Sequence, residues 1–455
     1  MGTKHNSLPD LPDSKKRRRA GVSNTGDAGV EANECIKIYL AFSKEEVDSP
    51  NIYQIQPVDV NHFFEDERIY GYQDLQITVW LSGISFHAFA EISFESSSDG
   101  GKGITDLKAS LQNMFAENLV EKKEDFLQTF SSEGHFVKSI VSSVDVLQID
   151  ASDCSTEESK AHLRENVEVF QVRGAGVGPL YARLVPLVLL LVDGSNPIDI
   201  TDPSWELYIV VQKATQDSDM LLVGFASVYR FYKYPDSTRM RLGQILIIPP
   251  YQRKGYGTSL LKALNNVAIS DNLYDLTIEE PVDSLQHVRT CIDVQRLLKF
   301  APINEPLDQA VALLKTENFS KKSQPTLLAP PPSLIEEVRK SFKINRIQFR
   351  QCWEILIYIR LDPIEKYLEN YKTTVSNRIK ADVIGKESKG NGKRVIDIRT
   401  DFEEDDSFSM FKTQDKEPDS TGEYGNQNNQ EEELKQLVDQ RMETIESVAR
   451  CVSSQ

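Results

Sequence analysis

Residues 252–257 form the part of the chain best suited to bind a negatively charged ligand. Four apolar residues at 245–248 predict a buried strand that ends at Pro249-Pro250; the sequence QRKGYG begins at residue 252, and helical spacing begins at residue 258. Where a strand leads through a glycine loop into a helix, backbone N–H groups without an intrahelical partner converge, and the helix dipole favours an anion. Gly255 and Gly257 let a phosphate approach the backbone, because they carry no Cβ. The segment therefore predicts a pyrophosphate-binding site.

Two common phosphate-binding motifs do not fit this segment. The dinucleotide motif Gly-x-Gly-x-x-Gly needs a third glycine at position 260, which is Leu260. The ATP-binding P-loop occurs nowhere in the chain; before Gly392-Lys393, Glu387 stands where its first glycine belongs. Residues 252–257 instead resemble Gln/Arg-x-x-Gly-x-Gly/Ala, the coenzyme A signature of the GCN5-related N-acetyltransferase (GNAT) superfamily. A plain turn is the alternative for a six-residue match, and the flanking strand and helix favour the coenzyme A site.

Acetyl transfer from a thioester to an amine needs a base, because a lysine is protonated near pH 7. The next predicted strand ends at the adjacent carboxylates Glu279 and Glu280. If the parallel strands splay at this point, Glu279 lies beside the thioester. A backbone N–H from residues 245–247 would then polarise the thioester carbonyl. The alternative is that both glutamates are simply solvated at the end of a strand.

The predicted elements around the glycine loop follow the order strand, strand, strand, helix, strand, helix, as expected of an acetyltransferase core. They are predicted at 205–213, 219–232, 239–248, 258–270, 274–279 and 283–298. Strand patterns and one helical stretch precede this core, and helical patterns follow a proline-rich linker. They lie at 36–42, 75–81, 84–94 and 105–130, and at 333–343, 345–361 and 431–448.

We therefore expect an α+β protein with a mixed α/β N-terminal domain, a central GNAT fold and a helical C-terminal region. Residues 1–32 are expected to form a disordered tail with a basic cluster, and residues 33–173 an N-terminal α+β domain. Residues 174–300 are expected to form an acetyl-CoA-binding catalytic domain and residues 301–375 a helical C-terminal domain. Residues 376–455 are expected to form an acidic, largely disordered tail with a terminal helix.

Charge is distributed unevenly along the chain. The net charge is −17, and residues 401–455 contain 15 acidic and 5 basic side chains. Because phosphate contacts need cations, this composition argues against direct nucleic-acid binding and favours attraction of a basic partner. A solubilising role is the alternative for residues 401–430. The cluster KKRRR at 15–19 predicts nuclear import, with a stray charge run as its alternative.

Cysteine usage and hydropathy indicate a soluble intracellular protein. Five cysteines are scattered without a Cys-x-x-Cys pair, which predicts reduced thiols, no disulfide frame and no metal site. The first 30 residues contain no apolar core, so no secretory signal is expected. The most apolar stretch, residues 184–192, has nine residues and is too short to cross a bilayer, so no membrane contact is expected.

Several further segments make the resemblance more specific. From about residue 35 to 375, the chain resembles the catalytic subunits of type B histone acetyltransferases. The segments that carry this resemblance are 71–75, 229–236, Arg239, 244–247, 252–257, 279–281 and 342–345. The resemblance implies transfer of acetyl from acetyl-CoA to the tail of newly made histone H4, alone or together with histone H3. It also implies a WD40-repeat histone chaperone as partner, and presence in nucleus and cytoplasm.

By position, the resemblance assigns the general base to Glu279 and two further carboxylates near the amine to Glu280 and Asp193. Asp193 is shorter than the glutamate usual there, and Val282 replaces a small polar residue that often contacts the cofactor. The acetyl-CoA contacts correspond to Ile245, Leu246, Ile247, Gln252, Arg253, Lys254, Gly255, Tyr256, Gly257 and Thr258. The histone-tail contacts correspond to Asp66, Glu67, Arg68, Tyr229, Arg230 and Phe231, of which Arg68 and Arg230 depart from the family pattern.

Two other functions remain compatible with the sequence. One is a GNAT enzyme that acetylates a different protein or a small amine, although a large N-terminal domain argues against the small amine. The other is a histone-escort protein that retains an inactive acetyltransferase fold. The intact glycine loop and Glu279 argue against this second alternative.

Overall fold

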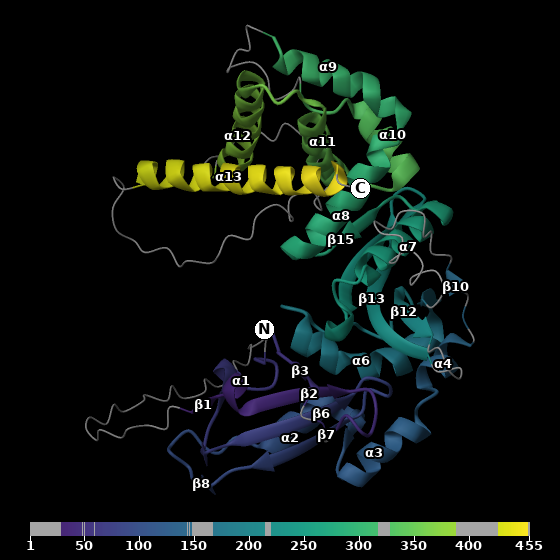
Figure 1. Ribbon diagram of the computed structural model, residues 1–455, viewed down its shortest axis with the longest axis vertical. Coiled ribbons are helices and arrows are strands. Elements are labelled where there is room, and N and C mark those ends of the chain that lie inside the picture. The colour runs from purple at the N-terminus through teal and green to yellow at the C-terminus, as the bar shows by residue number, and fades with distance from the viewer. Residues whose placement is uncertain are drawn as a thin grey trace, which may run out of the picture.

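The computed structural model describes most of residues 29–147 and four further ranges. The described residues are 29–47, 49, 51–58, 60–142, 144, 146–147, 167–213, 220–316, 328–387 and 426–453. Three units follow one another along the long axis: an N-terminal sheet domain, a central sheet and a group of C-terminal helices (Figure 1). The expected α+β fold class is confirmed. The basic cluster at 15–19 and the acidic segment 401–425 lie outside the described residues.

The N-terminal domain contains a five-stranded sheet in the order β3-β2-β6-β7-β9. The strands span Tyr53–Ile55 (β3), Ile36–Ala41 (β2), Gln76–Ser82 (β6), Ala88–Ser93 (β7) and Leu119–Val120 (β9). Successive side chains of a strand point to opposite faces, so each face meets its own helix. Helix α2 (Leu107–Phe115) shares a core with Val79, and helix α3 (Lys123–Ser132) packs with Trp80 on the other face.

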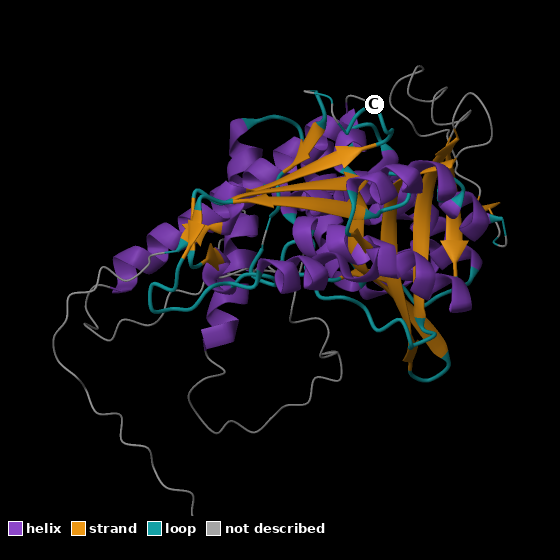
Figure 2. Cartoon of the chain, turned by 90° about the horizontal axis from the view of Figure 1, so that it is seen from below, coloured by secondary structure: helices purple, strands orange, loops and turns teal. Residues whose placement is uncertain are grey.

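The central sheet has six strands in sequence order, β10 to β15. They span Val146–Leu147, Val167–Val172, Trp205–Lys213, Met220–Lys233, Ser237–Ile247 and Leu276–Ile278. All neighbours are antiparallel except β14 and β15, which are parallel. In the second view, the hairpin of β13 and β14 projects beyond the rest of the sheet (Figure 2).

Helices cover both faces of this sheet. Helix α6 (Val177–Leu191) shares a core with Leu207 and Ile209 of β12, whereas helix α7 (Tyr256–Ser270) shares one with Tyr208 and Val210. Because both faces of β12 are buried, its residues are apolar without alternation, as in the sequence LYIVV.

Six α-helices within the described ranges form the C-terminal unit. They are α8 (Asp283–Leu298), α9 (Asn304–Leu314), α10 (Pro332–Phe342), α11 (Arg346–Arg360), α12 (Glu365–Glu387) and α13 (Asn426–Ser453). Their apolar side chains share one core, to which α13 contributes Val438, Ile445 and Val448. Helix α13 therefore packs on α8 and α11 although the sequence separates it from α12 by 38 residues outside the described ranges.

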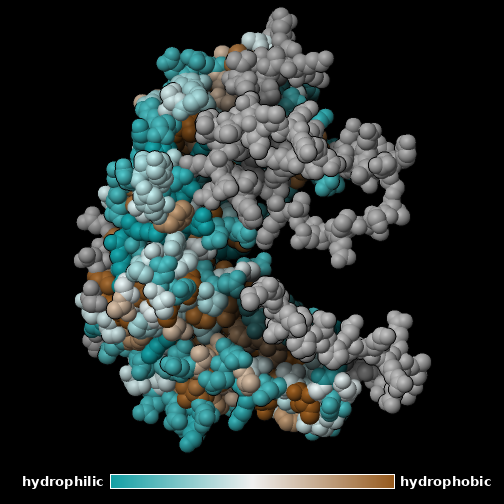
Figure 3. Space-filling view, turned by 180° about the vertical axis from the view of Figure 1, so that it is seen from behind, coloured by the Kyte–Doolittle hydropathy of each residue, from teal (hydrophilic) through white to brown (hydrophobic). Residues whose placement is uncertain are grey.

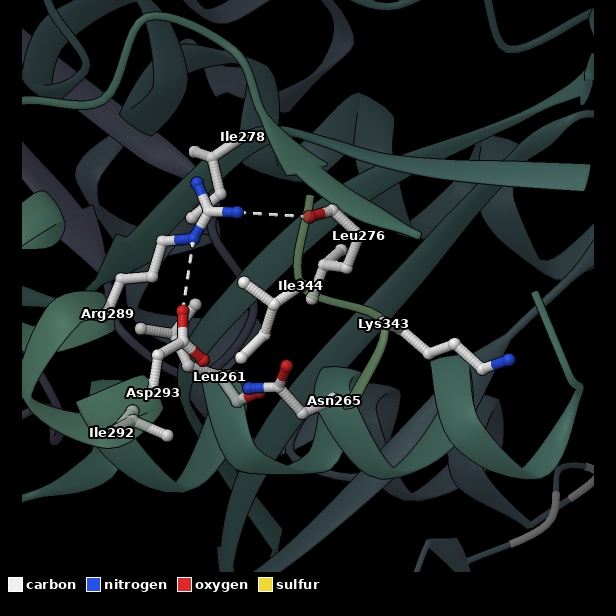
Figure 4. Close-up of a pocket in the computed structure, with 9 residues that line it drawn as sticks. All are labelled: Leu261, Asn265, Leu276, Ile278, Arg289, Ile292, Asp293, Lys343 and Ile344. Carbon is white, nitrogen blue, oxygen red and sulfur yellow. Dashed lines mark hydrogen bonds and ion pairs between the residues drawn. The ribbon is translucent and has the colours of Figure 1, made fainter. Parts of the chain in front are cut away.

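Buried polar groups join this unit to the central sheet around a small cavity (Figure 4). Arg289 of α8 donates to the carbonyl of Leu276 in β15 at 3.0 Å, and its Nε lies 3.8 Å from Asp293. Burial lowers the pKa of Arg289, while the carboxylate of Asp293 opposes that effect. The cavity has a volume of about 10 Å³, about the space of a single water, so it is a packing feature and not a substrate site.

Most predicted elements of the central and C-terminal units are confirmed, and two helices were missed. The strands β12 to β14 and helices α7, α8, α10 and α11 lie within a few residues of their predicted positions. Helices α9 and α12 were not predicted. The buried stripe of α12 is narrow, consisting of Tyr371, Val375 and Ile379, which gives a weak periodic signal. The basic, glycine-containing sequence of residues 386–394 predicts a flexible loop, but the segment begins inside α12, and its remainder lies outside the described residues.

The expected boundary at residue 173 falls just after β11, which belongs to the central sheet. Residues 167–172 pair with β12 over their whole length, so β10 and β11 extend the central sheet instead of closing the N-terminal domain. The sequence could not show this, because strand pairing is not visible in the pattern of a single strand.

Helix α6 is the one helix within the described ranges that is long and apolar enough to pass a test for a membrane span. Together with the preceding turn it covers residues 174–191, twice the nine residues counted from the sequence. Its side chains Leu180, Leu184 and Leu187 are fully buried in the core shared with the central sheet. In this structure, α6 is a core helix.

Candidate active site

Strands β14 and β15 separate at a β-bulge. They pair from Met240 with Leu276 to Leu242 with Ile278, and the Glu279 N–H still donates to the Leu242 carbonyl at 3.0 Å. Beyond this point β14 continues to pair only with β13, and Gly243 is the extra residue where the register with β13 shifts. The expected splay is therefore present, and it leaves residues 245–247 along an open strand edge.

The backbone of Ile245 and Ile247 faces this open edge. The Ile248 N–H donates to Val223 of β13 at 3.0 Å, and backbone groups alternate between the two sides of a strand. Accordingly, the Ile247 carbonyl turns away from β13 and accepts from the Gln252 side chain at 2.9 Å. The N–H groups of Ile245 and Ile247 are thus directed into the gap, where a ligand carbonyl could accept from them.

The glycine loop leads directly into α7. Gly255 is the N-cap residue and has φ 91°, a left-handed conformation that favours glycine. The Ser259 N–H donates to the Gly255 carbonyl, and this is the first hydrogen bond of the α7 backbone. The N–H groups of Tyr256, Gly257 and Thr258 therefore have no acceptor within the helix, as at any helix start.

The space over this helix start fits a pyrophosphate. A Cβ added at Gly257 would meet only Ile247 Cγ1, at 3.6 Å, which is an ordinary contact. The first turn of α7 is thus open above Gly257, so a phosphate can approach its N–H groups. Arg253 and Lys254, both exposed, add two cations beside it. The residues present fit the acetyl-CoA expected from the sequence.

Glu279 lies at the bulge. Its Oε2 is 3.8 Å from the position that a Cβ on Gly243 would occupy, and Trp205 Cη2 is 3.2 Å from the same point. Both Glu279 and Glu280 are exposed at the end of β15. The carboxylate of Glu279 therefore lies next to Gly243 of β14. Ile245, two residues further along the same strand, is the first residue whose N–H points into the gap.

Asp193 enters the site from the loop after α6. It is exposed and precedes Gly194, and the following residues Ser195 and Asn196 are hydrogen-bonded to Gln244 of β14. Gln244 is the neighbour of Gly243 in the chain. The structure thus brings the Asp193 loop and the strand end bearing Glu279 to the same bulge.

Aromatic side chains form a strip that leads towards Glu279. Trp205 and Tyr229 are 5.0 Å apart between ring centroids, Tyr229 and Phe231 are 6.1 Å apart, and the Arg241 guanidinium lies 5.0 Å from Phe231. Directly paired residues share a face, so the pairings of Tyr229 with Arg241 and of Arg241 with Thr277 continue the strip onto β15. Glu279 follows Thr277 by two residues and lies on this face.

The strip is held by Asp202, in the turn before β12. The Tyr229 hydroxyl donates to Asp202 Oδ2 at 2.9 Å. Hydrogen bonds from the backbone and side chain of Ser204, and then from Tyr229, lower the pKa of Asp202, so its acceptor form is favoured at neutral pH.

Arg230 lies on the opposite face of the sheet from Tyr229 and Phe231. Its guanidinium is 2.8 Å from Glu206 and 2.7 Å from Asp271, at the end of α7. Alternation along β13 explains this placement, because adjacent residues of a strand point to opposite faces. The structure therefore does not bring Arg230 together with its two predicted neighbours.

Asp66 and Arg68 line a separate pocket of about 430 Å³ in the N-terminal domain. Arg68 is 3.5 Å from Glu31, and Lys102 lies over the Tyr70 ring at 4.6 Å. The whole lining comprises Phe63, Phe64, Glu65, Asp66, Arg68, Tyr70, Lys102, Ile104 and Thr105.

Seen from behind, the molecule is hollowed between the N-terminal domain and the C-terminal helices (Figure 3).

One cluster of metal-binding residue types was not predicted. His287 and Cys291 of α8 and Cys451 of α13 place their ligand atoms within 4.8 Å of one another, and His287 Nε2 lies 3.6 Å from Cys291 Sγ. Burial raises the pKa of Cys291 to about 12, so its thiol stays protonated. Among the described residues this group supplies three ligand atoms, one fewer than the four of a typical structural zinc site.

Comparison with known proteins decides the family. Residues 28–193 match the family model described as the histone acetyl transferase HAT1 N-terminus, and residues 195–287 match the acetyltransferase (GNAT) family model. A histone acetyltransferase type B catalytic subunit of Arabidopsis thaliana is 49% identical over 96% of this chain and 95% of its own length. The chain belongs to the type B histone acetyltransferase catalytic subunits.

A maize relative gives the same assignment. The histone acetyltransferase type B catalytic subunit of Zea mays is 47% identical over 97% of this chain and 94% of its own length. This type B enzyme therefore joins a HAT1-type N-terminal region to a GNAT acetyltransferase domain, and the GNAT fold implies use of acetyl-CoA.

Some residues of the site were not identified as such from the sequence. They are the bulge residue Gly243, the anchoring residue Gln244, and Trp205, Asp202 and Arg241 around the aromatic strip. Gln244 gave a usable signal, since it is the one strongly polar residue between Leu242 and Ile248. The others depend on strand pairing, which the sequence does not show.

Proposed function

We propose that this type B enzyme transfers acetyl from acetyl-CoA to lysine side chains in the N-terminal tail of histone H4. One observation carries the proposal. Three groups converge at the β14 bulge. The N–H groups of Ile245 and Ile247 would polarise the thioester carbonyl, the start of α7 would bind the pyrophosphate, and the carboxylate of Glu279 would act as the base.

When bound, acetyl-CoA supplies the activated acetyl thioester. The N–H groups at the start of α7 hold the pyrophosphate, with Arg253 and Lys254 beside it. The N–H groups on the open edge of β14 donate to the carbonyl oxygen as it gains charge. Glu279 removes the proton from the lysine ammonium so that the amine attacks directly, while Glu280 and Asp193 favour the approach of that cation.

An extended basic peptide fits the surface around this site. The strip of Trp205, Tyr229 and Phe231 offers flat apolar faces to aliphatic lysine stems. In the N-terminal domain, Asp66 and Glu67 are acidic side chains that would attract cations elsewhere along the peptide. The net charge of −17 supports a basic substrate. Histone H3 alongside H4, and a WD40-repeat chaperone as partner, are proposed from the family resemblance alone. The same holds for presence in both nucleus and cytoplasm, which the basic cluster at 15–19 permits.

Acetyl transfer to synthetic H4 and H3 tail peptides tests the proposal. Glu279→Gln keeps the side-chain shape but removes the base, so kcat should fall by about 100-fold or more while KM for acetyl-CoA changes little. Glu121→Gln, at an exposed glutamate in the N-terminal domain, serves as the matched control.

Three outcomes contradict the proposal in different ways. Absence of transfer to every histone peptide, despite acetyl-CoA binding, indicates an inactive escort protein. Faster transfer to polyamines or unrelated proteins than to H4 indicates a different GNAT substrate. Unchanged turnover in Glu279→Gln across the pH range removes Glu279 as the base.

A further inference from the structure

Gln244 is a buried amide in an otherwise apolar part of β14. Only 6% of it is exposed, and its neighbours Leu246 and Ile248 are core residues. A buried polar side chain weakens a core unless its hydrogen bonds are all made. Gln244 makes four, so the carboxamide is fully satisfied.

The four bonds link separate elements. The Gln244 oxygen accepts from Tyr181 of α6 at 2.9 Å and from Ser227 of β13 at 3.1 Å. The Gln244 nitrogen donates to the Ser195 hydroxyl at 2.8 Å and to the Asn196 carbonyl at 2.7 Å. Both donor bonds reach the loop that starts at Asp193.

Tyr181 holds the same loop a second time. Its hydroxyl accepts from the Ile198 N–H at 3.2 Å while it donates to Gln244. These hydrogen bonds hold the loop at residues 195, 196 and 198, and each of the three is made by Gln244 or by its partner Tyr181. Without the amide, the Asp193 loop keeps only the contact between Tyr181 and Ile198 among these bonds.

On its other side, Gln244 adjoins the bulge that receives the base. Gly243 precedes it, and the Glu279 carboxylate lies 3.8 Å from the Cβ position of Gly243. Two elements that are far apart in the sequence, the end of α6 and the end of β15, therefore meet at one dipeptide of β14.

We propose that Gln244 is a positioning residue for acetyl transfer, which fixes the Asp193 loop to the β14 bulge so that Asp193 and Glu279 face the same substrate amine. This inference rests on the proposed function. Gln244 acts through Asp193 and does not itself touch the reacting atoms. Its removal should therefore lower kcat and leave the acetyl-CoA contacts at residues 252–258 unchanged.

Gln244→Met tests the inference, because methionine has a similar length and makes none of the four bonds. We expect kcat on the H4 peptide to fall by at least 10-fold while KM for acetyl-CoA stays within twofold. Gln348→Met is the matched control: Gln348 is also a buried, hydrogen-bonded glutamine, bound to Asp293 and Gln286, but it lies in α11. It should lower the melting temperature without a comparable loss of kcat.

A double-mutant cycle separates positioning from general destabilisation. Asp193→Asn should reduce kcat several-fold in the wild-type background and less than twofold in Gln244→Met, because the loop is already displaced there. Equal effects in both backgrounds overturn the inference. If Gln244→Met does not fold, Ser195→Ala removes one of the two loop bonds without altering the core, and should lower kcat in the same direction by a smaller factor.

Hydrogen exchange tests the attachment independently of any substrate. Amides 194–198 should exchange at least 10-fold faster in Gln244→Met than in wild type, with no such change in Gln348→Met. If the wild-type enzyme acetylates no histone peptide, the proposed function fails, and unchanged exchange at 194–198 separately overturns the role of Gln244.

Discussion

At the scale of single residues, the site depends on how little space surrounds Gly243. This glycine is the extra residue of the bulge, with the Trp205 indole on one side and the Glu279 carboxylate on the other. A side chain here would crowd the first ring of the aromatic strip and come into contact with the base. The position therefore tests whether the bulge, and not just the charge of Glu279, sets the geometry of the reaction.

Gly243→Ala should lower kcat by about 10-fold with little change in the fold. The added methyl would lie 3.2 Å from Trp205 Cη2, so the indole at the start of the aromatic strip must shift by a few tenths of an ångström, while Glu279 Oε2, at 3.8 Å, only comes into ordinary contact with it. The methyl fills space beside the base where the substrate amine approaches, and misplacement of reacting groups lowers the rate steeply. Gly178→Ala is the control, because its methyl would meet only Ile200 at 3.6 Å inside α6. Equal kcat in the two variants would show that the bulge tolerates a side chain.

A second residue-scale prediction concerns the thiols of Cys35 and Cys291. Burial raises the pKa of Cys35 to about 11 and that of Cys291 to about 12. Since the thiolate is the reactive form, its fraction at pH 8 is about 1 in 1,000 for Cys35 and 1 in 10,000 for Cys291.

Iodoacetamide at pH 8 should therefore label neither cysteine in the folded enzyme, whereas both should react in guanidinium chloride. Labelling should increase with pH up to these pKa values, as long as the fold persists. Peptide mass spectrometry distinguishes the two sites. Rapid labelling of Cys291 alone would contradict the prediction, and would show that His287, at 3.6 Å, activates the thiol.

At the scale of elements, a buried ion pair fixes the start of the short strand β15. Arg239 of β14 donates to Asp275 at 2.6 and 2.9 Å, and their side chains are 5% and 2% exposed. The pair lies just before the three residues of β15, at the end of the strand opposite Glu279. It therefore fixes the parallel pairing from which the two strands later separate.

Asp275→Asn should destabilise the protein by roughly 3–5 kcal/mol, because it leaves a buried guanidinium without its counter-charge. Asp308→Asn is the control. It removes an ion pair with Arg360 whose side chains are 57% and 47% exposed, and such surface pairs contribute at most about 1 kcal/mol. Denaturant unfolding compares the two variants, and similar midpoints would contradict the structural role of the buried pair.

The elements of the central unit could be predicted because their patterns are local. The apolar run before Pro249, the glycine loop and the periodic residues of α7 each specify their own structure. The bulge at Gly243 could not be predicted in this way, since it is a mismatch between two strands. The position of Arg230 follows from alternation along β13, yet its face could be assigned only once the helix over each face was known.

At the scale of the whole molecule, the site is built from segments that lie far apart in the sequence. Asp193 comes from the HAT1-type N-terminal region, Glu279 from the GNAT domain, and the start of α8 beyond Glu279 connects to α11 through Gln286 and Gln348. Which segments meet was not predictable from their patterns, because each contact joins residues tens of positions apart. The charge of the chain, in contrast, is read directly from its sequence.

That charge predicts a salt-dependent enzyme. A chain with net charge −17 attracts a basic tail over a distance that salt shortens, so kcat/KM for the H4 peptide should fall by about 10-fold from 25 to 250 mM salt. A peptide whose spectator lysines and arginines are replaced by glutamine should lose less than twofold over the same range. A flat response for both peptides would show that steering does not contribute.

The acidic segment 401–425 can be tested in the same assay. It contains nine acidic residues, and their joint replacement by the corresponding amides removes nine negative charges from the full-length chain. If the segment attracts the histone tail, this variant should have a lower kcat/KM at 25 mM salt, and its kcat/KM should fall less between 25 and 250 mM. Its kcat at saturating peptide should be unchanged, because long-range attraction speeds the encounter and not the chemical step.

If the segment only keeps the protein soluble, the salt dependence will match that of the unmodified enzyme while the tendency to precipitate rises. The two roles differ in this way because steering acts on the rate of association, whereas solubility depends on repulsion between copies of the same chain.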